Sequence, residues 1–405
     1  MKMIQETLTK YKALPVVVKS MIALFWIYEL VAQMTTIFVN AYVYLNTQNI
    51  EILIQYNFWN VFGIGLGFVL WGYIVSIFQI SFRLNYAKSF VIFILSFFIL
   101  IFLPNNALAY FWFAVVNGLA VGMFWVGVHT YELMHTEDKI RDFYSSMISA
   151  GSVILKMLSP MLAIASFYIS EYVFGFEMYT IFFIIIPFLY LSAIPFIFSL
   201  PNYTPEKISS LSIKRLFTND EISNVRKYLF FSSIDFAILA VIVPIVAIQS
   251  LSTPYNIGYV EFLSGIIAFL AIIALSHKRN TTNRVDILNI AILGIAVMGG
   301  ILLLYPFHWM FYVIGSIGLI LLIPVYRVSI HVLDLVSMEK MKKVNNSIYE
   351  GVLYRDFILL IGRFFSLFLL YIATLLTNNE YIVIVFGMIV ILVAYVLTGL
   401  YAKKI

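Results

Sequence analysis

Long apolar stretches separated by short polar gaps run through the whole chain, and this pattern limits the possible folds more than any single motif does. Most stretches hold the roughly 20 residues that an α-helix needs to cross the ~30 Å hydrocarbon layer of a bilayer. Only 11% of the residues are charged, whereas a soluble domain has about 25%. The sequence therefore predicts an all-α polytopic membrane protein with twelve transmembrane helices, at 18–44, 52–78, 86–103, 107–134, 143–169, 178–200, 228–250, 255–276, 286–304, 309–335, 352–377 and 381–402.

Lys and Arg are distributed unevenly over the gaps. All but three of the 25 Lys and Arg lie in alternate gaps, in the terminal segments or at the edges of the flanking stretches, and every other gap has none. Basic residues near the ends of transmembrane helices stay on the cytoplasmic side. Both termini and the five basic gaps are therefore predicted to be cytoplasmic, which requires an even number of helices. We expect a multi-pass protein of the cell membrane.

Composition and motifs exclude several classes of function. The net charge of +5 is explained by topology and by contact with anionic lipid, so no nucleic-acid partner is expected. The chain has no Cys, which removes disulfides and thiolate chemistry, and neither a cofactor nor a metal is expected. Walker, H-E-x-x-H and nucleophile-elbow motifs are absent from the sequence, and the non-basic gaps are short. We therefore expect a protein that is not an enzyme.

The two ends of the chain have matching features. Residues 1–200 and 228–405 each hold six stretches, and 201–227 is predicted to be a cytoplasmic linker with a short amphipathic helix. A His and an acid at i, i+3 end both the fourth and the tenth stretch, and one cation lies inside both the fifth and the eleventh. These residues are His129 and Glu132, His331 and Asp334, and Lys156 and Arg363. The matches predict two duplicated six-helix halves, an internal repeat found in many transporters.

Motifs near the second and fifth stretches add to this duplicated plan. Gly72, Arg83 and Lys88 surround the second gap, and Gly151 and Pro160 lie in the fifth stretch. With six plus six stretches and a longer central loop, nearly the whole chain resembles the major facilitator superfamily of secondary transporters. The family also has an Asp in the second gap and paired glycines in its antiporter motif, and both are missing here. The resemblance implies that helices 1, 4, 7 and 10 line a central cavity and that the protein works as a monomer.

Polar side chains form a stripe along the first stretch. Glu29, Gln33, Thr36 and Asn40 follow i, i+4, i+7 and i+11, which places them on one face of a helix. Glu29 lies ten residues beyond Lys19, or about 15 Å along the helix axis. We interpret the stripe as the lining of a substrate cavity. The alternative is a polar seam that holds neighbouring helices together.

Two acids lie inside the membrane on matching stretches. Asp235 on the seventh stretch is about 12 Å along the axis from Lys227 and corresponds to Glu29 on the first. A carboxyl group desolvated in the membrane can bind and release a proton at working pH, so both acids are predicted to carry the coupling proton. The alternative is structural, with Glu29 paired to Lys156 and Asp235 paired to Arg363.

Other charged residues are predicted to form charge pairs or gates. The acid and His that end the tenth stretch are only about 8 Å from the polar gap, which favours gating contacts over substrate binding. The predicted charge-pair and gating residues are Lys156, Arg363, His129, Glu132, His331, Asp334, Arg83 and Glu261. Arg327 is deeper, about 18 Å from Glu339, and is predicted to be a ligand for a substrate anion.

Glycines recur at helical spacing inside two stretches. These are Gly63 and Gly67 in the second stretch, and Gly118 and Gly122 in the fourth. Small residues at i, i+4 let two membrane helices approach closely. The spacing therefore predicts tight helix packing and not a phosphate-binding loop.

The leading hypothesis is a secondary active transporter that moves a small amphiphilic or hydrophobic molecule by alternating access, with H⁺ as the coupling ion. Efflux is favoured over uptake because the expected cavity is aromatic and acidic in the first half and offers few neutral hydrogen-bonding groups in the second. Trp26 and Trp125 flank the cavity-side positions and could stack on a flat or cationic substrate. The alternatives are a lipid or glycolipid flippase on the same scaffold and a proton-coupled importer of a nutrient or metabolite. A membrane enzyme that uses lipid-linked sugars is the least favoured.

Overall fold

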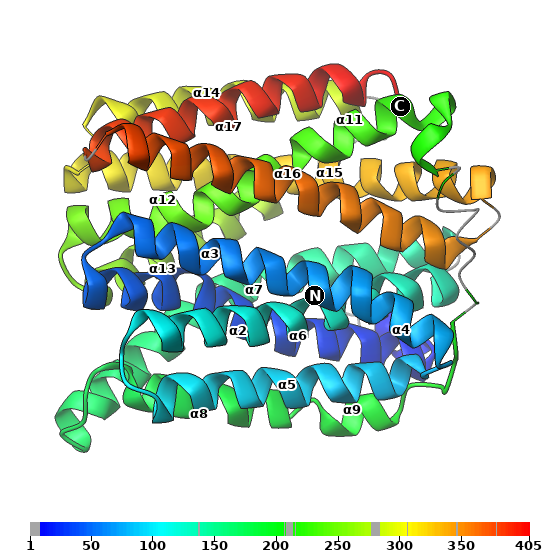
Figure 1. The fold of residues 1–405 in the computed structure, drawn as a ribbon, viewed down its shortest axis with the longest axis horizontal. Coiled ribbons are helices and arrows are strands. Elements are labelled where there is room, and N and C mark those ends of the chain that lie inside the picture. The colour runs from blue at the N-terminus through cyan, green and yellow to red at the C-terminus, as the bar shows by residue number, and fades with distance from the viewer. Residues whose placement is uncertain are drawn as a thin grey trace.

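The protein is built from long helices that lie side by side in a bundle, as Figure 1 shows. The computed structural model describes residues 9–136, 138–205, 207, 214, 216–276, 284–305, 307–345, 347–377 and 379–405. Within the helices it describes the backbone alone at 138–139, 141–142, 271–276, 284–287, 320, 324, 327–328, 331–332, 335, 345 and 348. All regular structure in this described part is helical, which confirms the predicted all-α class.

Residues up to 200 form the first group of helices. These are α2 (Val16–Thr47), α3 (Ile50–Gly65), the π-helical turn η1 (Leu66–Leu70), α4 (Trp71–Ile77), α5 (Phe82–Phe102), α6 (Ala107–His135), α7 (Asp138–Tyr168), the π-helical turn η2 (Ile169–Val173), α8 (Tyr179–Leu191) and α9 (Ile194–Phe198). The second group consists of the 3₁₀ turn η3 (Asp220–Ile222), α11 (Ser223–Ser232), α12 (Ile234–Leu251), α13 (Pro254–Ser276), α14 (Arg284–Leu304), α15 (Trp309–Asn345), α16 (Ile348–Leu376) and α17 (Glu380–Ala402).

Each predicted apolar stretch lies on one helix or on a run of consecutive helices. In the described part of the chain, nine of these are long and apolar enough to cross a membrane, and α14 and α15 add shorter apolar helices. The prediction of a multi-pass membrane protein is thus confirmed, and the count of twelve holds approximately. Helix α15 continues past the end of its apolar stretch at 335 to Asn345, so Lys340, Lys342 and Lys343 of the basic gap lie on helix.

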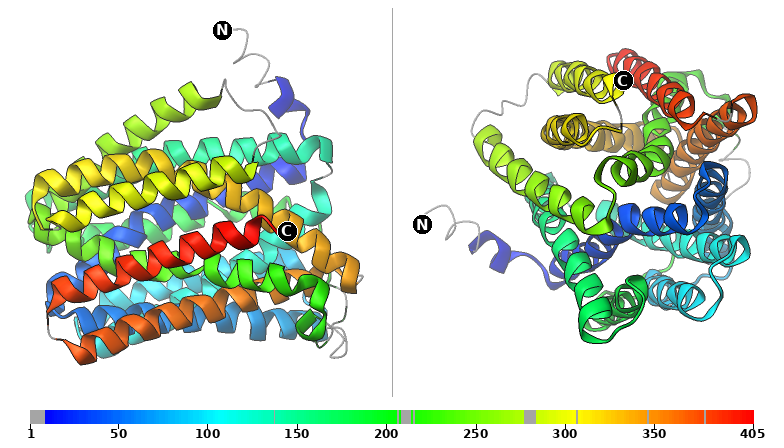
Figure 2. Two further views of the ribbon diagram at one scale, coloured as in Figure 1. Left: turned by 90° about the horizontal axis from the view of Figure 1, so that it is seen from above. Right: turned by 90° about the vertical axis from the view of Figure 1, so that its left-hand side faces the viewer.

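The helices alternate in direction, so their ends gather at two opposite faces of the bundle (Figures 1 and 2). Helices α4, α6, α9, α15 and α17 end at the face that holds the basic gaps, which is called the basic end below. Helices α2, α5, α12, α14 and α16 end at the other face, called the opposite end. Helix α2 begins at the basic end, and helix α17 ends there.

Short polar side chains begin several helices. At five starts, a side-chain oxygen accepts a hydrogen bond from a backbone N–H of the first turn, and the residues are Asn49, Ser81, Asn106, Ser347 and Asn379. Such caps satisfy donors that the first turn of a helix leaves without a partner. The polar gaps therefore encode where the helices start, as well as separating the apolar stretches.

Two kinds of contact hold the bundle together. Within each group, neighbouring helices such as α3 and α6, α5 and α6, or α14 and α15 pack closely. Between the groups, α2 packs on α12, α3 on α16, and α7 on α13. The site described below lies along this second set of contacts.

The glycines predicted to pack closely do so in the contact between α3 and α6. A Cβ placed on Gly118 would lie 2.2 Å from the carbonyl oxygen of Asn60 and 3.0 Å from the Cα of Gly63. A Cβ on Gly67 would lie 2.2 Å from the carbonyl oxygen of Leu119. Because the obstructing atoms are backbone, no side chain can move to make room. The i, i+4 glycine spacing is explained by this contact.

The glycine contact predicts that Gly118→Ala is destabilising by about 1–3 kcal/mol or more, the usual effect of overpacking a close interface. Gly300 in α14 is the matched control, since a Cβ there meets nothing within 4 Å. Gly300→Ala should be neutral or slightly stabilising, because Ala favours helix over Gly. Thermal unfolding in detergent measures both variants. Equal melting temperatures would contradict the proposed contact.

Candidate functional site

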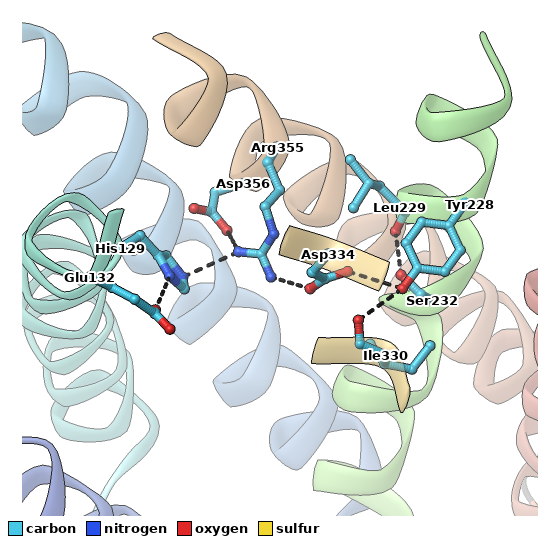
Figure 3. Close-up of polar contacts among 9 residues, drawn as sticks. All are labelled: His129, Glu132, Tyr228, Leu229, Ser232, Ile330, Asp334, Arg355 and Asp356. Atoms are coloured by element: carbon cyan, nitrogen blue, oxygen red, sulfur yellow. Dashed lines mark hydrogen bonds and ion pairs between the residues drawn. The ribbon is translucent and has the colours of Figure 1, made fainter. Parts of the chain in front are cut away.

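A buried charged cluster joins the two groups of helices at the basic end (Figure 3). Its centre is Arg355 on α16, whose guanidinium donates to Asp334 on α15 and, over 2.9 Å, to Asp356. The same guanidinium lies 3.1 Å from Nε2 of His129 on α6, in the other group of helices. One cation therefore connects two acids of the second group of helices with a His of the first group. These two groups are called the two halves below.

The cluster extends outward from Arg355 on both sides. Nδ1 of His129 lies 3.8 Å from a carboxylate oxygen of Glu132, one turn further along α6. The hydroxyl of Tyr228 on α11 donates to Asp334 over 3.0 Å (Figure 3). The side chains less than 10% exposed are those of Arg355, Asp334, His129, Glu132 and Tyr228. Buried charges are tolerated when they are paired, and Arg355 has the carboxylates of Asp334 and Asp356 as partners of opposite charge.

A second contact between the halves lies at the same end. The hydroxyl of Tyr349, near the start of α16, donates to the backbone carbonyl of Gly72 on α4 over 2.7 Å. A Cβ on Gly72 would lie 2.6 Å from Cδ2 of Leu353 and 3.4 Å from the Tyr349 hydroxyl, so α4 and α16 pack closely here. The basic end is thus closed by α4 and α6 against α16.

The sequence predicted part of this cluster and missed its centre. His129, Glu132 and Asp334 were predicted as gating residues, and the structure brings them together. Arg355 lies at the edge of the predicted stretch 352–377 and was counted with the basic gap before it, but it lies two turns inside α16 and is only 7% exposed. The signal available in the sequence was the position of Arg355 within the eleventh predicted stretch, 352–377. The side chains of His331 and Arg327 lie outside the described residues.

The predicted stripe on α2 forms a ladder of hydrogen bonds. Gln33 donates to the Glu29 carboxylate over 2.7 Å, and the amide of Asn40 donates to the backbone carbonyl of Thr36 over 2.7 Å. Asn40 in turn accepts from Asn57 on α3 over 2.7 Å. Thr36 is exposed and Glu29 and Gln33 are partly exposed, whereas Asn40 is buried. The stripe is accessible over most of its length and anchored to α3 at its far end.

Aromatic side chains surround the Glu29 level of α2. The indole N–H of Trp125 on α6 donates to the hydroxyl of Tyr28 over 3.2 Å, and the Trp125 ring stacks on His129 with 5.1 Å between centroids. Trp125 therefore connects this level with the charged cluster at the basic end. Trp26 packs differently, against α7, where a Cβ on Gly151 would lie 2.0 Å from its Nε1.

The cations inside the membrane face the other half. Lys156 on α7 interacts electrostatically with Glu261 on α13, so an acid other than Glu29 lies in its field. Arg363 on α16 lies over the Phe236 ring at 4.4 Å from its centroid and interacts electrostatically with Tyr28 on α2. Both cations thus lie along the contact between the halves.

Asp235 lies in a different place from Glu29. Its carboxylate accepts a hydrogen bond from Tyr395 on α17 over 3.1 Å, and it is only 2% exposed. The Tyr395 ring contacts Tyr326 on α15 with 4.8 Å between centroids. Asp235 is therefore packed within the second group of helices, while Glu29 lies on an accessible stripe. Arg83, at the start of α5, interacts electrostatically with Tyr131 of its own half.

A third set of contacts closes the opposite end. Glu380 at the start of α17 accepts from the hydroxyl of Tyr44 on α2 over 2.9 Å and from the amide of Gln249 on α12. The hydroxyl of Tyr255 on α13 donates to Glu171 of η2 over 2.6 Å. The sequence analysis did not predict these contacts. In these contacts the acceptors are the carboxylates of Glu171 and Glu380, and the donors are neutral hydroxyl and amide groups. None of the residues in these contacts is a cation like Arg355.

Comparison with solved structures identifies the fold. No family model and no curated protein matches this chain. Among solved structures, the nucleoside transporter NupG aligns with a TM-score of 0.61 at 13% identity, over 96% of this chain and 98% of its own. A D-xylose-proton symporter aligns with a TM-score of 0.66 at 14% identity, over 96% of each chain. Both have the fold of the major facilitator superfamily.

This chain has the major facilitator fold. The resemblance inferred from the spacing of apolar stretches and basic gaps is thereby confirmed at the level of architecture. In this fold, the charged cluster lies at the basic end of the bundle and the carboxylate contacts lie at the opposite end, with the Glu29 stripe of α2 between them.

The charged cluster predicts a large effect of Arg355→Met on stability. Without the guanidinium, two buried carboxylates lose their cation, and breaking a buried pair in this way is destabilising by about 3–5 kcal/mol. Adding Asp334→Asn should restore part of the loss. Unfolding in detergent measures the two variants against Lys343→Met, an exposed cation of α15 that should change stability by less than about 0.5 kcal/mol. An effect of Arg355→Met no larger than this control would refute the pairing.

Proposed function

We propose that the protein is a secondary active transporter that exports a small amphiphilic or hydrophobic molecule by alternating access, with H⁺ as the coupling ion. Residues 1–200 and 228–405 are the two moving halves and 201–227 is their linker. The basic end faces the cytoplasm, with both termini on that side of the cell membrane. The observation that carries this proposal is that polar contacts join the halves at both ends of the bundle, with an accessible acidic stripe between them.

Alternating access requires two gates, each able to open while the other is closed. The contact of Arg355 with His129 is suited to the cytoplasmic gate. When the halves separate there, Arg355 keeps Asp334 and Asp356 as partners, so no charge is left alone. At the opposite end, Tyr44 of the first half exchanges its contacts with Glu380 and Gln249 of the second half for water as that gate opens. Hydrogen bonds of this kind differ little in free energy from those made with water, which makes both gates reversible.

Glu29 is the proposed proton carrier. It is the acid of the accessible stripe, it lies at the level of Trp125 and Tyr28, and its carboxylate is oriented by Gln33. An ionisable residue at this depth is usually functional because its burial in lipid would cost roughly 2.5–3.5 kcal/mol. Asp235 is a second acid for the same role, and its hydroxyl donor Tyr395 could pass a proton only within the second half.

The substrate class follows from the side chains around Glu29. Indole and phenol rings next to a carboxylate suit a flat, apolar and preferably cationic molecule, since cations are attracted to aromatic faces. Export is favoured because such molecules enter cells through the bilayer without a carrier. Arg327 on α15 is the proposed ligand for substrates that carry an anionic group.

Replacement of Glu29 tests the coupling. Glu29→Gln should lower proton-driven transport at least tenfold in vesicles energised by a pH gradient, because the amide cannot release a proton. The probe is a fluorescent lipophilic cation, with a lipid-linked glycan and a sugar as competitors. Glu221→Gln, an exposed acid of η3, should leave transport unchanged. Unaltered pH-driven transport by Glu29→Gln would sink the assignment, and competition by the glycan alone would favour a flippase.

The two proposed gates can be tested independently of any substrate. The chain has no Cys, so pairs of spin labels can be placed directly. One pair, Asn46→Cys with Leu376→Cys, reports the opposite end, and another, Phe78→Cys with Lys403→Cys, reports the basic end. Glu380→Gln should lengthen distances in the first pair only, and Arg355→Gln in the second pair only.

The control for the opposite end is Glu51→Gln. Glu51 is an acid of the same end whose carboxylate accepts from Gln55 of its own helix, so its loss should leave both distances unchanged. If Glu380→Gln and Glu51→Gln give the same distance distributions, the contact of Glu380 with Tyr44 is not a gate.

A further inference from the structure

A shallow cavity at the basic end lies on the surface of α11 and α16. It has a volume of about 320 Å³ and is lined by Arg226, Lys227, Phe230, Phe231, Ile358 and Ile361. Two cations thus stand at one edge of a floor made only of apolar side chains. We propose that this cavity binds an anionic phospholipid, with the phosphate at the cations and an acyl chain along the apolar floor.

Further positive charge gathers at the same edge. The ammonium groups of Lys227 and Lys404 each lie 5.6 Å from the centroid of the Tyr401 ring. Phe231, which belongs to the cavity floor, stacks on Tyr401 with 5.8 Å between centroids. Two like charges next to one ring repel each other, so an anion that binds between them is stabilised by both. Each Lys or Arg near an anionic lipid surface contributes about 1 kcal/mol.

The apolar floor distinguishes a lipid from a free phosphate ion. Phe365 is 44% exposed and contacts Phe230 with 5.6 Å between ring centroids. Phe368, three residues further on, is 55% exposed. Ile361, Phe365 and Phe368 share one face of α16 at i, i+4 and i+7. This face leads from the cations toward the membrane centre, which is the path of an acyl chain and of no use to an inorganic anion.

The cavity backs directly onto the cytoplasmic gate. Lys227 is followed by Tyr228, which points to the inner side of α11 and donates to Asp334. Ile358 lies one turn beyond Arg355 on α16. A lipid bound across α11 and α16 therefore contacts the two helices that carry Tyr228 and Arg355, on the side away from the charged cluster. The lipid class links the state of the gate to the charge of the inner leaflet.

Native mass spectrometry of the purified full chain tests the site, with phosphatidylglycerol and phosphatidylcholine as competing probes. The wild-type chain should retain phosphatidylglycerol in preference. The double variant Lys227→Gln with Lys404→Gln should bind it roughly 30-fold more weakly, from two contributions of about 1 kcal/mol. Arg226 is kept, because it donates to the carbonyls of Leu216 and Asn219 over 2.9 Å and so holds the linker.

The control is Lys88→Gln with Lys343→Gln, which removes two cations from the same end. Lys88 also lies over an aromatic ring, that of Trp71, at 5.1 Å. This variant should keep the wild-type affinity, and Ile361→Gln should weaken lipid binding in a chain with unchanged cations. Equal losses in both double variants would overturn the proposal, as would equal retention of phosphatidylcholine or binding of inorganic phosphate as tight as that of the lipid.

Discussion

The buried guanidinium of Arg355 imposes the strongest constraint on this structure. A charge removed from water needs partners wherever it lies, because the desolvation penalty of a single unpaired ion is several kcal/mol. Asp334 and Asp356 satisfy that requirement within one half, and His129 adds a neutral or charged partner from the other. The cation therefore remains compensated whether or not the halves touch. A cluster with its only acids on the opposite half would be locked shut.

The bundle separates rigid contacts from breakable ones. Inside the first half, α3 and α6 meet through glycines whose backbones touch, so that even a methyl group finds no space. Between the halves, the contacts include hydroxyl, amide and charged groups that water can replace, such as Tyr349 with Gly72 and Tyr44 with Glu380. Close backbone packing resists deformation, whereas exchangeable hydrogen bonds have similar free energy in the protein and in water. The proposed movement of the halves would therefore break the exchangeable contacts and leave the glycine contact intact.

Features that depend on neighbours along one helix could be predicted from the sequence, and features that depend on the meeting of distant helices could not. Hydrophobic length located the helices, i, i+4 spacing located the glycine contact, and i, i+3 spacing located His129 and Glu132. The electrostatic interaction of Lys156 with Glu261 joins two helices of different halves, and no local pattern in the sequence predicts it. Arg355 was misplaced for a related reason. A cation at the edge of an apolar stretch has the same hydropathy whether it faces water or turns inward to buried acids.

The two ends of the bundle differ in the charge of the side chains that close them. At the basic end, Arg226 and Lys227 of α11 line the surface cavity, and Tyr228 beside them donates to Asp334 of the charged cluster. The opposite end has no Lys or Arg in its gaps, and its contacts use Glu171 and Glu380 as acceptors. A carboxylate accepts more strongly than the protonated acid does, because charge-assisted hydrogen bonds are roughly twice as strong as neutral ones. In the proposed transporter, protonation of Glu171 or Glu380 would weaken the closure of the opposite end, whereas the guanidinium at the basic end keeps its charge throughout. The proposed proton response of one end and the proposed lipid response of the other thus follow from the different chemistry of the residues that close them.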